Sequence, residues 1–320
     1  MKYTVYGSEE LDNNIDNCMK KISKSMMQKL PHNEIAAIIL GGGYGRGEGG
    51  FVIENGTEHL YNDFDMFILA NNISRKRKRE LTPIILEISE ELTKEIGIDV
   101  DFSPIQNIST LEKAPYWMMW YDLKMGHQVI LGDKNILNKL PNWKAEDMPM
   151  IEGLRLVLNR GAGLFQAGIK FRGDNLSEVD LRHLEKDISK AFMACGDMFL
   201  IAHKNFTHSY VGKIEAINKF KHVDIITDDD FVTHHIASIN YKLKPDRADI
   251  NQDSLKELYD KILLLYRKFW LFGFSILLDQ KIENFVTCNR LLLSHGYKEP
   301  DDNSLLKNIV LNIKEIGMKN

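Results

Sequence analysis

The spacing of apolar residues changes part-way along this 320-residue chain. Up to about residue 145, short apolar runs and alternating segments predict β-strands separated by amphipathic helices. Beyond about residue 150, apolar residues recur every three or four positions, which is typical of helices that bury one face. Two long stripes show this second pattern: Leu181, Leu184, Ile188, Ala191, Cys195 and Phe199, and then Leu255, Leu258, Ile262, Leu265, Phe269, Phe272 and Ile276.

The change of pattern predicts an α+β fold with two domains. We expect a domain with a small mixed β-sheet at 1–145 and an α-helical bundle at 146–320, with Pro141 and Pro149 marking the boundary. In chain order, the elements predicted for the first domain are a helix over 9–30, a strand over 35–40, a hairpin over 51–61 that turns at 54–57, a strand over 62–69, a helix capped by Ser74 and ending near 96, and strands over 98–102 and 126–133.

A glycine-rich segment, 41–50, follows the first predicted strand directly. Glycine leaves the backbone N–H groups accessible and permits positive φ, so such a segment can surround an anion such as a phosphate. A dinucleotide-binding fold requires a helix directly after its glycines, but the strand-like 51–53 comes next. A P-loop is excluded as well, because no Gly-Lys-Ser/Thr closes the segment.

Acidic residues follow on two predicted strands. Asp63 and Asp65 lie two positions apart in an alternating segment, so both carboxylates are expected on one face, roughly 7 Å apart along the chain. A third carboxylate is available at Asp101, near the end of the next alternating segment, and Asp99 points to the same face and could replace it. Carboxylates grouped beside an anion site suit Mg²⁺ ions that carry phosphate oxygens, and two such ions need more than two aspartates.

Each feature taken singly has a simpler explanation. The glycine segment is compatible with a flexible surface loop, and the pair of aspartates with a charged strand edge that discourages aggregation. Their order along the chain, with Arg46-Gly47 inside the segment and an acidic strand afterwards, favours a shared site.

Gly42-Gly43, Arg46-Gly47, Asp63-Phe64-Asp65-Met66 and the later Asp101 together resemble the nucleotidyltransferase-fold superfamily, which includes DNA polymerase β, kanamycin nucleotidyltransferase and small MNT-type proteins. The resemblance covers about residues 20–105, and its spacer between Gly43 and Asp63 is longer than usual. It implies an ATP-binding or other nucleotide-binding enzyme that transfers a nucleotidyl group from a nucleoside triphosphate to an acceptor hydroxyl and releases pyrophosphate. Asp63, Asp65 and Asp101 would then bind two Mg²⁺ ions, and Gly42, Gly43 and Arg46 would hold the triphosphate.

Net charge and the distribution of apolar residues and cysteines indicate which kinds of partner and cellular location to expect. The net charge of −4 argues against a general nucleic-acid-binding protein and favours a small-molecule acceptor. No apolar segment is long enough for a membrane helix, and the first residues lack the apolar core of a signal peptide, so we expect a cytoplasmic protein without membrane insertion. Cys18, Cys195 and Cys288 are too dispersed to predict disulfides or zinc.

The predicted bundle offers further candidates for the site. Four basic residues could reach phosphates and four acidic residues could act as a general base: Arg155, Arg160, Lys170 and Arg172, and Glu178, Asp180, Glu185 and Asp187. Tyr116–Tyr121 is an aromatic and methionine cluster that favours core packing over base stacking. The acids Asp228–Asp230 before His234-His235 indicate a helix start rather than a metal site.

Several alternatives remain open at this level. The acceptor, the preferred base and the oligomeric state are not determined by these patterns. An enzyme that modifies a protein or tRNA, as in a toxin–antitoxin pair, and a non-catalytic nucleotide-binding protein fit the same motif.

Overall fold

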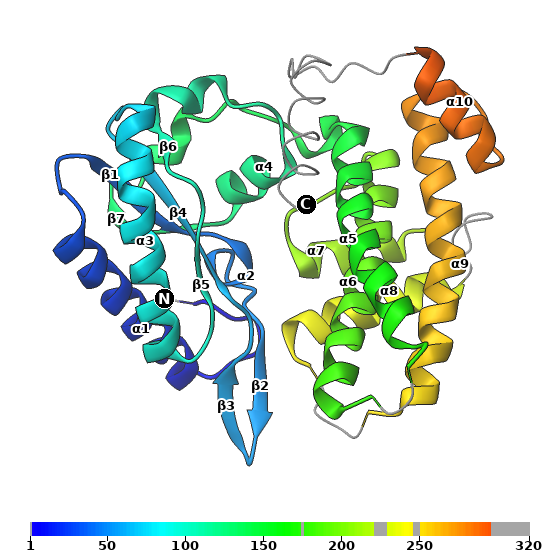
Figure 1. Ribbon diagram of the computed structural model, residues 1–320, viewed down its shortest axis with the longest axis horizontal. Helices are drawn as coiled ribbons and strands as arrows, with labels where there is room; N and C mark the ends of the chain where they lie inside the picture. Colours follow the sequence, from blue (N-terminus) through cyan, green and yellow to red (C-terminus); the bar gives the residue numbers. More distant parts are fainter. Residues whose placement is uncertain (1, 174–175, 221–228, 246–249, 296–320) are drawn as a thin grey trace, which may run out of the picture.

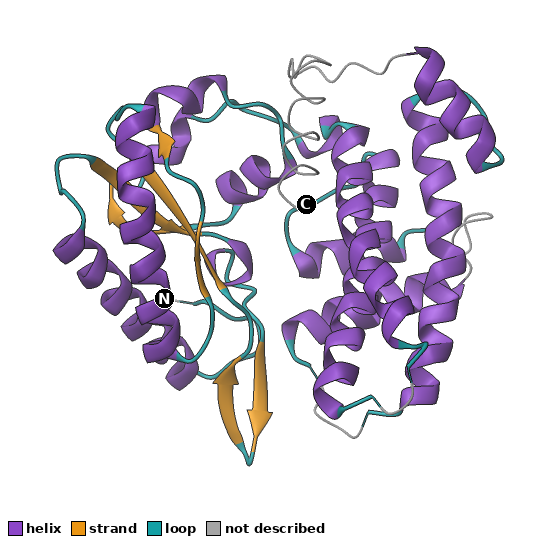
Figure 2. Cartoon of the chain, viewed as in Figure 1, coloured by secondary structure: helices purple, strands orange, loops and turns teal. Residues whose placement is uncertain are grey.

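The computed structural model describes residues 2–173, 176–220, 229–245 and 250–295. A sheet-containing lobe and a helical lobe lie side by side (Figure 1), and all described strands belong to the first lobe (Figure 2). The mixed sheet and the following helices confirm the α+β class.

The sheet is built around β1 (Ile35–Leu40), an apolar strand that is buried for most of its length. Its strand order is β5-β4-β1-β7, and β1 pairs antiparallel with both β4 (Phe64–Ala70) and β7 (Gln128–Gly132). Two short strands, β5 (Val100–Phe102) and β6 (Gln106–Asn107), run parallel to β4. The predicted mixed sheet is therefore correct, although β4 begins one residue after Asp63.

Helices cover one face of this sheet. α1 (Glu9–Lys29) and α3 (Arg75–Ile96) pack there with the inward side chains of β4, Phe64, Met66 and Ile68. Ser74 caps α3 by accepting the N–H of Arg77, as predicted. Because side chains alternate along a strand, Asp65 belongs to the opposite face.

That opposite face is covered only in part. α4 (Met118–Met125) and the short 3₁₀ segments η1 (Ile108–Lys113) and η2 (Ile136–Lys139) pack on Leu69 and Phe67 of β4. Another 3₁₀ turn, η3 (Ala145–Asp147), leads to the helical lobe. The end of the sheet near Asp65 therefore faces the space between the lobes.

The predicted hairpin forms outside the main sheet. β2 (Phe51–Glu54) and β3 (Thr57–Leu60) pair antiparallel around Asn55 and Gly56. Both turn residues have positive φ, 51° and 80°, as a two-residue hairpin turn of this kind requires. The extra residues between the glycine segment and Asp63 are accommodated here.

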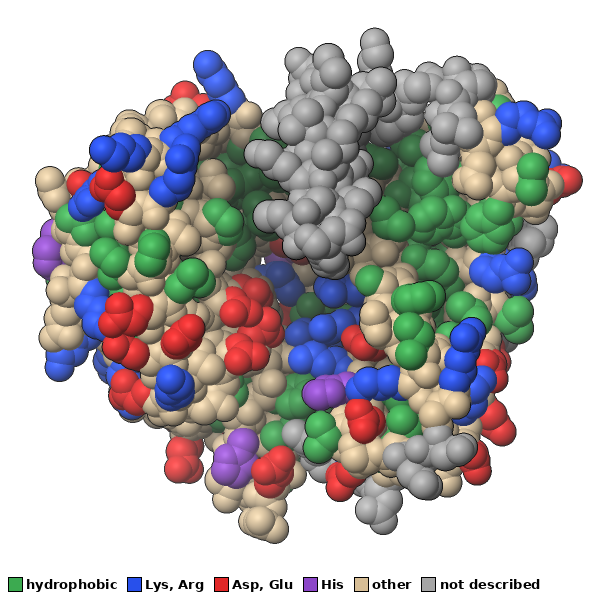
Figure 3. Space-filling model, viewed as in Figure 1, with side chains coloured by type: hydrophobic (Ala, Val, Ile, Leu, Met, Phe, Trp, Pro, Cys, Tyr) green, Lys and Arg blue, Asp and Glu red, His purple; other side chains and the backbone are tan. Residues whose placement is uncertain are grey.

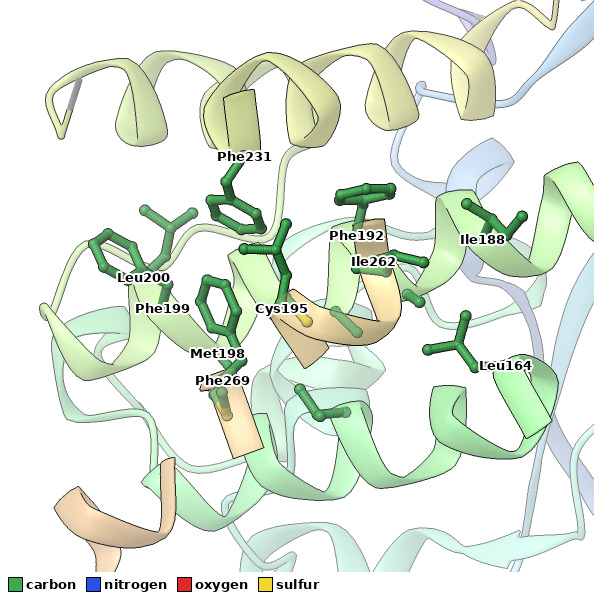
Figure 4. Packing of buried hydrophobic residues seen from close by; sticks show 14 of the residues in the cluster. Leu164, Ile188, Phe192, Cys195, Met198, Phe199, Leu200, Phe231, Ile262 and Phe269 are labelled. Atoms are coloured by element: carbon green, nitrogen blue, oxygen red, sulfur yellow. The ribbon is translucent and has the colours of Figure 1, made fainter. Parts of the chain in front are cut away.

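The helical lobe is organised around α6 (Glu178–Ala202), whose second half is almost entirely buried. Its neighbours are α5 (Met150–Lys170), α8 (Asp229–Leu243) and α9 (Gln252–Leu277), with α7 (Tyr210–Asn218) and α10 (Phe285–His295) at the periphery. Figure 4 shows Cys195 of α6 packed with Phe231 of α8 and Phe269 of α9. The predicted stripes supply this core, except that Ile276 is 41% exposed.

The hydrophobic cores follow the two lobes closely. Two clusters lie on the faces of the sheet and draw on residues 3–140, whereas the third joins the helices of the second lobe with Tyr121 and Met148. Within the described ranges, no helix is both long and apolar enough to cross a membrane.

Candidate active site

The three predicted aspartates lie on adjacent segments of the sheet. Asp65 of β4 stands opposite Asp101 of β5 in the parallel register, and Asp63 directly precedes β4. Neighbouring strands are about 4.8 Å apart, so registered side chains share one face. Asp99, the alternative to Asp101, precedes β5, and its carbonyl accepts the Phe64 N–H at 2.8 Å. The register therefore favours Asp101 as the partner of Asp65.

Negative charge is concentrated on this face. Burial and then the Asp63 carboxylate raise the pKa of Asp65 to about 6, against the opposing effects of Lys242 and Arg46. Burial, followed by Asp63 and Asp99, also raises the pKa of Asp101. Neighbouring carboxylates thus make ionisation of Asp65 and Asp101 harder, and a bound divalent cation would relieve this repulsion.

The donor chemistry fits Mg²⁺, but the aspartates do not form a complete cage. Among the residues that the structure describes, no group of three or more His, Cys, Asp or Glu side chains is arranged to hold a metal ion. Mg²⁺ usually keeps several waters and binds through one or two carboxylates plus substrate phosphates. Asp65 and Asp101 could supply those two carboxylates.

The glycine segment faces Asp65 closely. The Gly41 N–H donates to the Asp65 carbonyl at 2.8 Å, and a Cβ atom on Gly42 would lie only 1.9 Å from Asp65 Oδ2. Gly42 also has a φ of 58°, which L side chains rarely adopt. Only glycine therefore permits this approach of backbone to carboxylate.

Part of the segment is helical, whereas the sequence suggested an open turn. Gly42–Gly45 form α2, a single turn closed by the Gly45 N–H and the Gly41 carbonyl at 2.8 Å. The buried Tyr44 side chain anchors this turn through a 2.6 Å hydrogen bond to the Gly50 carbonyl. The N–H groups of Gly42 and Gly43 begin the turn and have no intrahelical partner, so they are available to an anion.

Arg46 lies deeper than the sequence suggested. Its guanidinium is 3.7 Å from Glu48 and 3.9 Å from Asp122, and it stacks over the Tyr210 ring at 4.9 Å. Its side chain is 8% exposed, although it still lines the cavity described below. These neighbours offset much of its charge, so Arg46 suits a supporting position better than the main phosphate contact.

Glu48 was not recognised as important from the sequence. Its buried carboxylate accepts the Ser209 hydroxyl at 2.7 Å and the N–H groups of Tyr210 and Val211 at 2.8 and 3.1 Å. These groups begin α7, so a residue of the glycine segment caps a helix of the other lobe. The one sequence signal is an acidic side chain among glycines.

A cavity of about 350 Å³ lies between the lobes at this point. Gly42, Gly43 and Asp65 line one side, and Arg160 of α5, Lys190 of α6 and Lys242 of α8 line the other. Acidic side chains of the sheet lobe face basic side chains of the helical lobe across this hollow (Figure 3).

The basic wall is as crowded as the acidic one. Burial, and then the charges of Lys186, Arg160 and Lys242, lowers the pKa of Lys190 to about 8. Lys242 also donates to Asn62 at 3.0 Å, which fixes it beside the strand that carries the aspartates. Cations that repel one another favour a polyanionic ligand.

A larger groove, about 790 Å³, lies between α1 and β7. Its charged lining consists of scattered side chains of α1 and the following loops, such as Lys24 and Lys134, with one acid, Asp16. The smaller cavity is the better candidate because acidic and basic groups converge on it from both lobes.

Most basic candidates of the second lobe are engaged elsewhere. Arg160 lines the cavity, but Arg155 pairs with Glu152 and Lys170 pairs with Asp180 at 2.6 Å. Arg172 lines a separate groove between α5 and α9.

None of the four acidic candidates for a general base lines the cavity. Asp180 forms a capping box with Ser177 at the start of α6, and Glu178 pairs with Arg182 at 3.5 Å. Glu185 and Asp187 lie further along the same helix, outside the cavity.

Two other predictions concern the bundle and the aromatic cluster. Asp230 pairs with Lys261 at 2.6 Å and His235 is buried in the bundle, whereas Asp228 lies outside the described residues. The aromatic cluster divides: Trp120 and Tyr121 are buried, but Met118 and Met119 line the cavity.

No protein-family model matches this chain, and no curated protein is significantly similar to it. The resemblance to nucleotidyltransferases therefore depends on the site residues alone.

Proposed function

We propose that this protein is a Mg²⁺-dependent nucleotidyltransferase that moves a nucleoside monophosphate from a nucleoside triphosphate to a hydroxyl of a small-molecule acceptor. One observation carries this proposal: Asp65, which is registered with Asp101 of β5, lies beside Gly42 and across a 350 Å³ cavity from Arg160, Lys190 and Lys242.

The two walls suit the two halves of a metal–triphosphate complex. Asp65 and Asp101 would hold Mg²⁺ together with the substrate phosphates, with Asp63 beside them. The ion, when bound, would supply charge neutralisation and lower the pKa of the acceptor hydroxyl. The N–H groups of Gly42 and Gly43 would donate to phosphate oxygens. Arg160, Lys190 and Lys242 would balance the charge of the phosphate chain from the opposite side.

The residues act by binding and orientation. With the triphosphate held along the cavity, the acceptor oxygen forms a bond to the α-phosphorus as the bond from that phosphorus to the β-bridging oxygen breaks. Pyrophosphate leaves and the hydroxyl proton passes to solvent or to a basic group. Alignment of this kind accounts for a large part of the barrier reduction in phosphoryl transfer.

Pyrophosphate release tests the proposal directly. The parent protein, incubated with each nucleoside triphosphate, Mg²⁺ and a metabolite extract as acceptor source, is expected to release pyrophosphate. Asp65→Asn and Asp101→Asn should lower the rate at least about 100-fold. Asp253→Asn, at an exposed position on α9, is the matched control and should leave the rate unchanged.

The same assay separates the alternatives. A smaller loss for Asp99→Asn than for Asp101→Asn is expected from the β4–β5 register. Binding of the triphosphate without pyrophosphate release under any condition would support a non-catalytic nucleotide-binding protein instead. If neither Asp65→Asn nor Asp101→Asn slows pyrophosphate release, the proposed site is wrong.

A further inference from the structure

Orphaned polar atoms belong to cavity residues around the Arg46–Asp122 and Lys213–Asp197 ion pairs, a region called the inner end below. Among the described residues, Arg46 Nε, Asp122 Oδ1 and Asp197 Oδ1 are buried atoms without a hydrogen-bond partner, and all three residues line this cavity. Asp197 is 6% exposed, and its other oxygen accepts Lys213 Nζ at 2.8 Å. Leaving such atoms unpaired is costly, so a bound polar molecule that reaches them would gain free energy by supplying the missing hydrogen bonds.

This inner end differs in charge from the phosphate wall. Three carboxylates, Glu48, Asp122 and Asp197, surround the cations Arg46 and Lys213. Fixed charges therefore sum to about −1 here, whereas Arg160, Lys190 and Lys242 carry only positive charge on the other wall. A phosphate group at the inner end would face carboxylate oxygens and lose free energy by repulsion.

The remaining lining of the inner end is apolar. Met118, Met119 and Leu123 of α4 and Met193 of α6 lie among the polar residues. Methionine adapts to irregular shapes and packs well on C–H surfaces. A ligand here would place carbon atoms against this wall and polar atoms against the unpaired groups.

The unpaired donors and acceptors of the protein determine which polar groups of a ligand fit here. Asp122 Oδ1 and Asp197 Oδ1 need donors, and Arg46 Nε needs an acceptor. A hydroxyl group is both donor and acceptor, whereas an ammonium group only donates and a phosphate dianion only accepts. Several hydroxyls on one carbon skeleton match the whole set.

We infer that the inner end of the cavity, formed by Arg46, Asp122, Asp197 and the methionines of α4, binds the acceptor and that this acceptor is an uncharged polyhydroxylated molecule rather than a phosphorylated one. This assignment rests on the proposed function for its role in the reaction. Binding of the polyhydroxylated molecule to this end of the cavity does not require a bound nucleotide.

Saturation-transfer NMR on the full-length protein without nucleotide tests the assignment. The probes are D-glucose, D-ribose and myo-inositol, compared with D-glucose 6-phosphate and D-ribose 5-phosphate. We expect transfer to at least one uncharged probe and a dissociation constant at least about tenfold weaker for its phosphorylated counterpart, equivalent to about 1.4 kcal/mol.

Two variants locate the binding. Asp122→Asn keeps the size of the side chain, and the ion pair of Asp122 with Arg46 is long at 3.9 Å, so folding should be retained. Asp122→Asn should weaken binding of the uncharged probe about fivefold or more. Met119→Trp, at a position that is 44% exposed, fills the same end without removing a charge and should also weaken it. Lys268→Gln, at an exposed position on α9, is the control and should leave binding of this probe unchanged.

Several outcomes would overturn the assignment. These are no transfer to any uncharged probe, equal or tighter binding of the phosphorylated probes, or binding that both variants leave unchanged. Failure of the proposed function would look different, because the protein would then bind polyols at this end yet release no pyrophosphate.

Discussion

At the scale of single residues, the site consists of like charges held close together on two opposed walls. The Asp65 carboxyl has its pKa raised by burial and Asp63, and the Lys190 ammonium has its pKa lowered by burial and its basic neighbours. Both groups are less stable in their charged forms than they would be in water. Such crowding is common where a protein is built to bind a charged ligand.

Replacing Lys190 should therefore stabilise the protein at neutral pH. Its pKa of about 8 in the folded state lies below the ordinary 10.5, so between these values the folded chain binds fewer protons than the unfolded chain. Stability of the parent must then rise with pH through that window, and the full cost of the charge is present below pH 8. We expect Lys190→Gln to raise the free energy of unfolding at pH 7 by about 1–3 kcal/mol.

Urea unfolding at pH 7 and at pH 10 measures this difference. The advantage of Lys190→Gln should shrink markedly at pH 10, and Lys268→Gln, at an exposed position on α9, should change little at either pH. If Lys190→Gln is less stable than the parent at pH 7, the prediction is wrong, because the Lys190 ammonium group would then have stabilising partners in the protein without ligand.

The sequence predicted Asp65 and Arg160, which line the cavity from opposite sides, but neither Lys190 nor Lys242. Asp63, Asp65 and Asp101 belong to short alternating segments, so their common face follows from strand geometry. Lys190 and Lys242 are ordinary lysines of amphipathic helices until those helices are placed opposite the sheet. The role of Glu48 is likewise explained only by its partners at the start of α7, of which Ser209 is 161 residues away in the chain.

At the scale of elements, the glycine segment and α7 depend on each other. α2 contributes Gly42 and Gly43 to the cavity, and Glu48, a few residues later, caps α7 with three hydrogen bonds. Tyr210 of α7 in turn lies under the Arg46 guanidinium. The cap therefore joins the start of α7 to the glycine segment that lines the cavity.

Glu48→Ala should disturb stability and nucleotide binding together. Loss of a buried cap with three partners is expected to cost about 2–4 kcal/mol in urea unfolding. Ser177→Ala removes the cap of α6, away from the cavity, and is the matched control. We expect the control to lower stability by about 1 kcal/mol without changing ATP affinity, as measured by calorimetry.

The two variants must differ in affinity for this interpretation to hold. If Glu48→Ala loses stability but binds Mg²⁺ and ATP as tightly as Ser177→Ala, the cap serves the helix alone.

Element prediction succeeded where the signal was local. The hairpin turn at Asn55-Gly56 and the Ser74 cap were both recognisable within a few residues. α2 was missed because glycine disfavours helix, and the burial of Tyr44 overrides that preference. The two-residue strand β6 is too short to give a periodic pattern.

At the scale of the whole molecule, the site exists only where the lobes meet. Tyr61 and Tyr241 lie with their hydroxyl oxygens 3.2 Å apart, and Asn62 and Lys242 exchange hydrogen bonds beside them. Each pair joins residues about 180 positions apart in the chain. No periodic pattern encodes such contacts, which is why the sequence predicted two domains but not how they enclose the cavity.

Thermal unfolding with nucleotide and metal tests the central claim most directly. The parent protein is heated with ATP, GTP, CTP or UTP at pH 7.5, in the presence of Mg²⁺ or of EDTA, and compared with Asp63→Asn/Asp65→Asn. A ligand at 100 times its dissociation constant stabilises by about 2.7 kcal/mol, so a rise in Tm of about 5 °C is expected for at least one nucleotide. This rise in Tm is expected to require Mg²⁺ and both aspartates. Equal rises in the parent and the double variant, or in Mg²⁺ and EDTA, would contradict the proposed site.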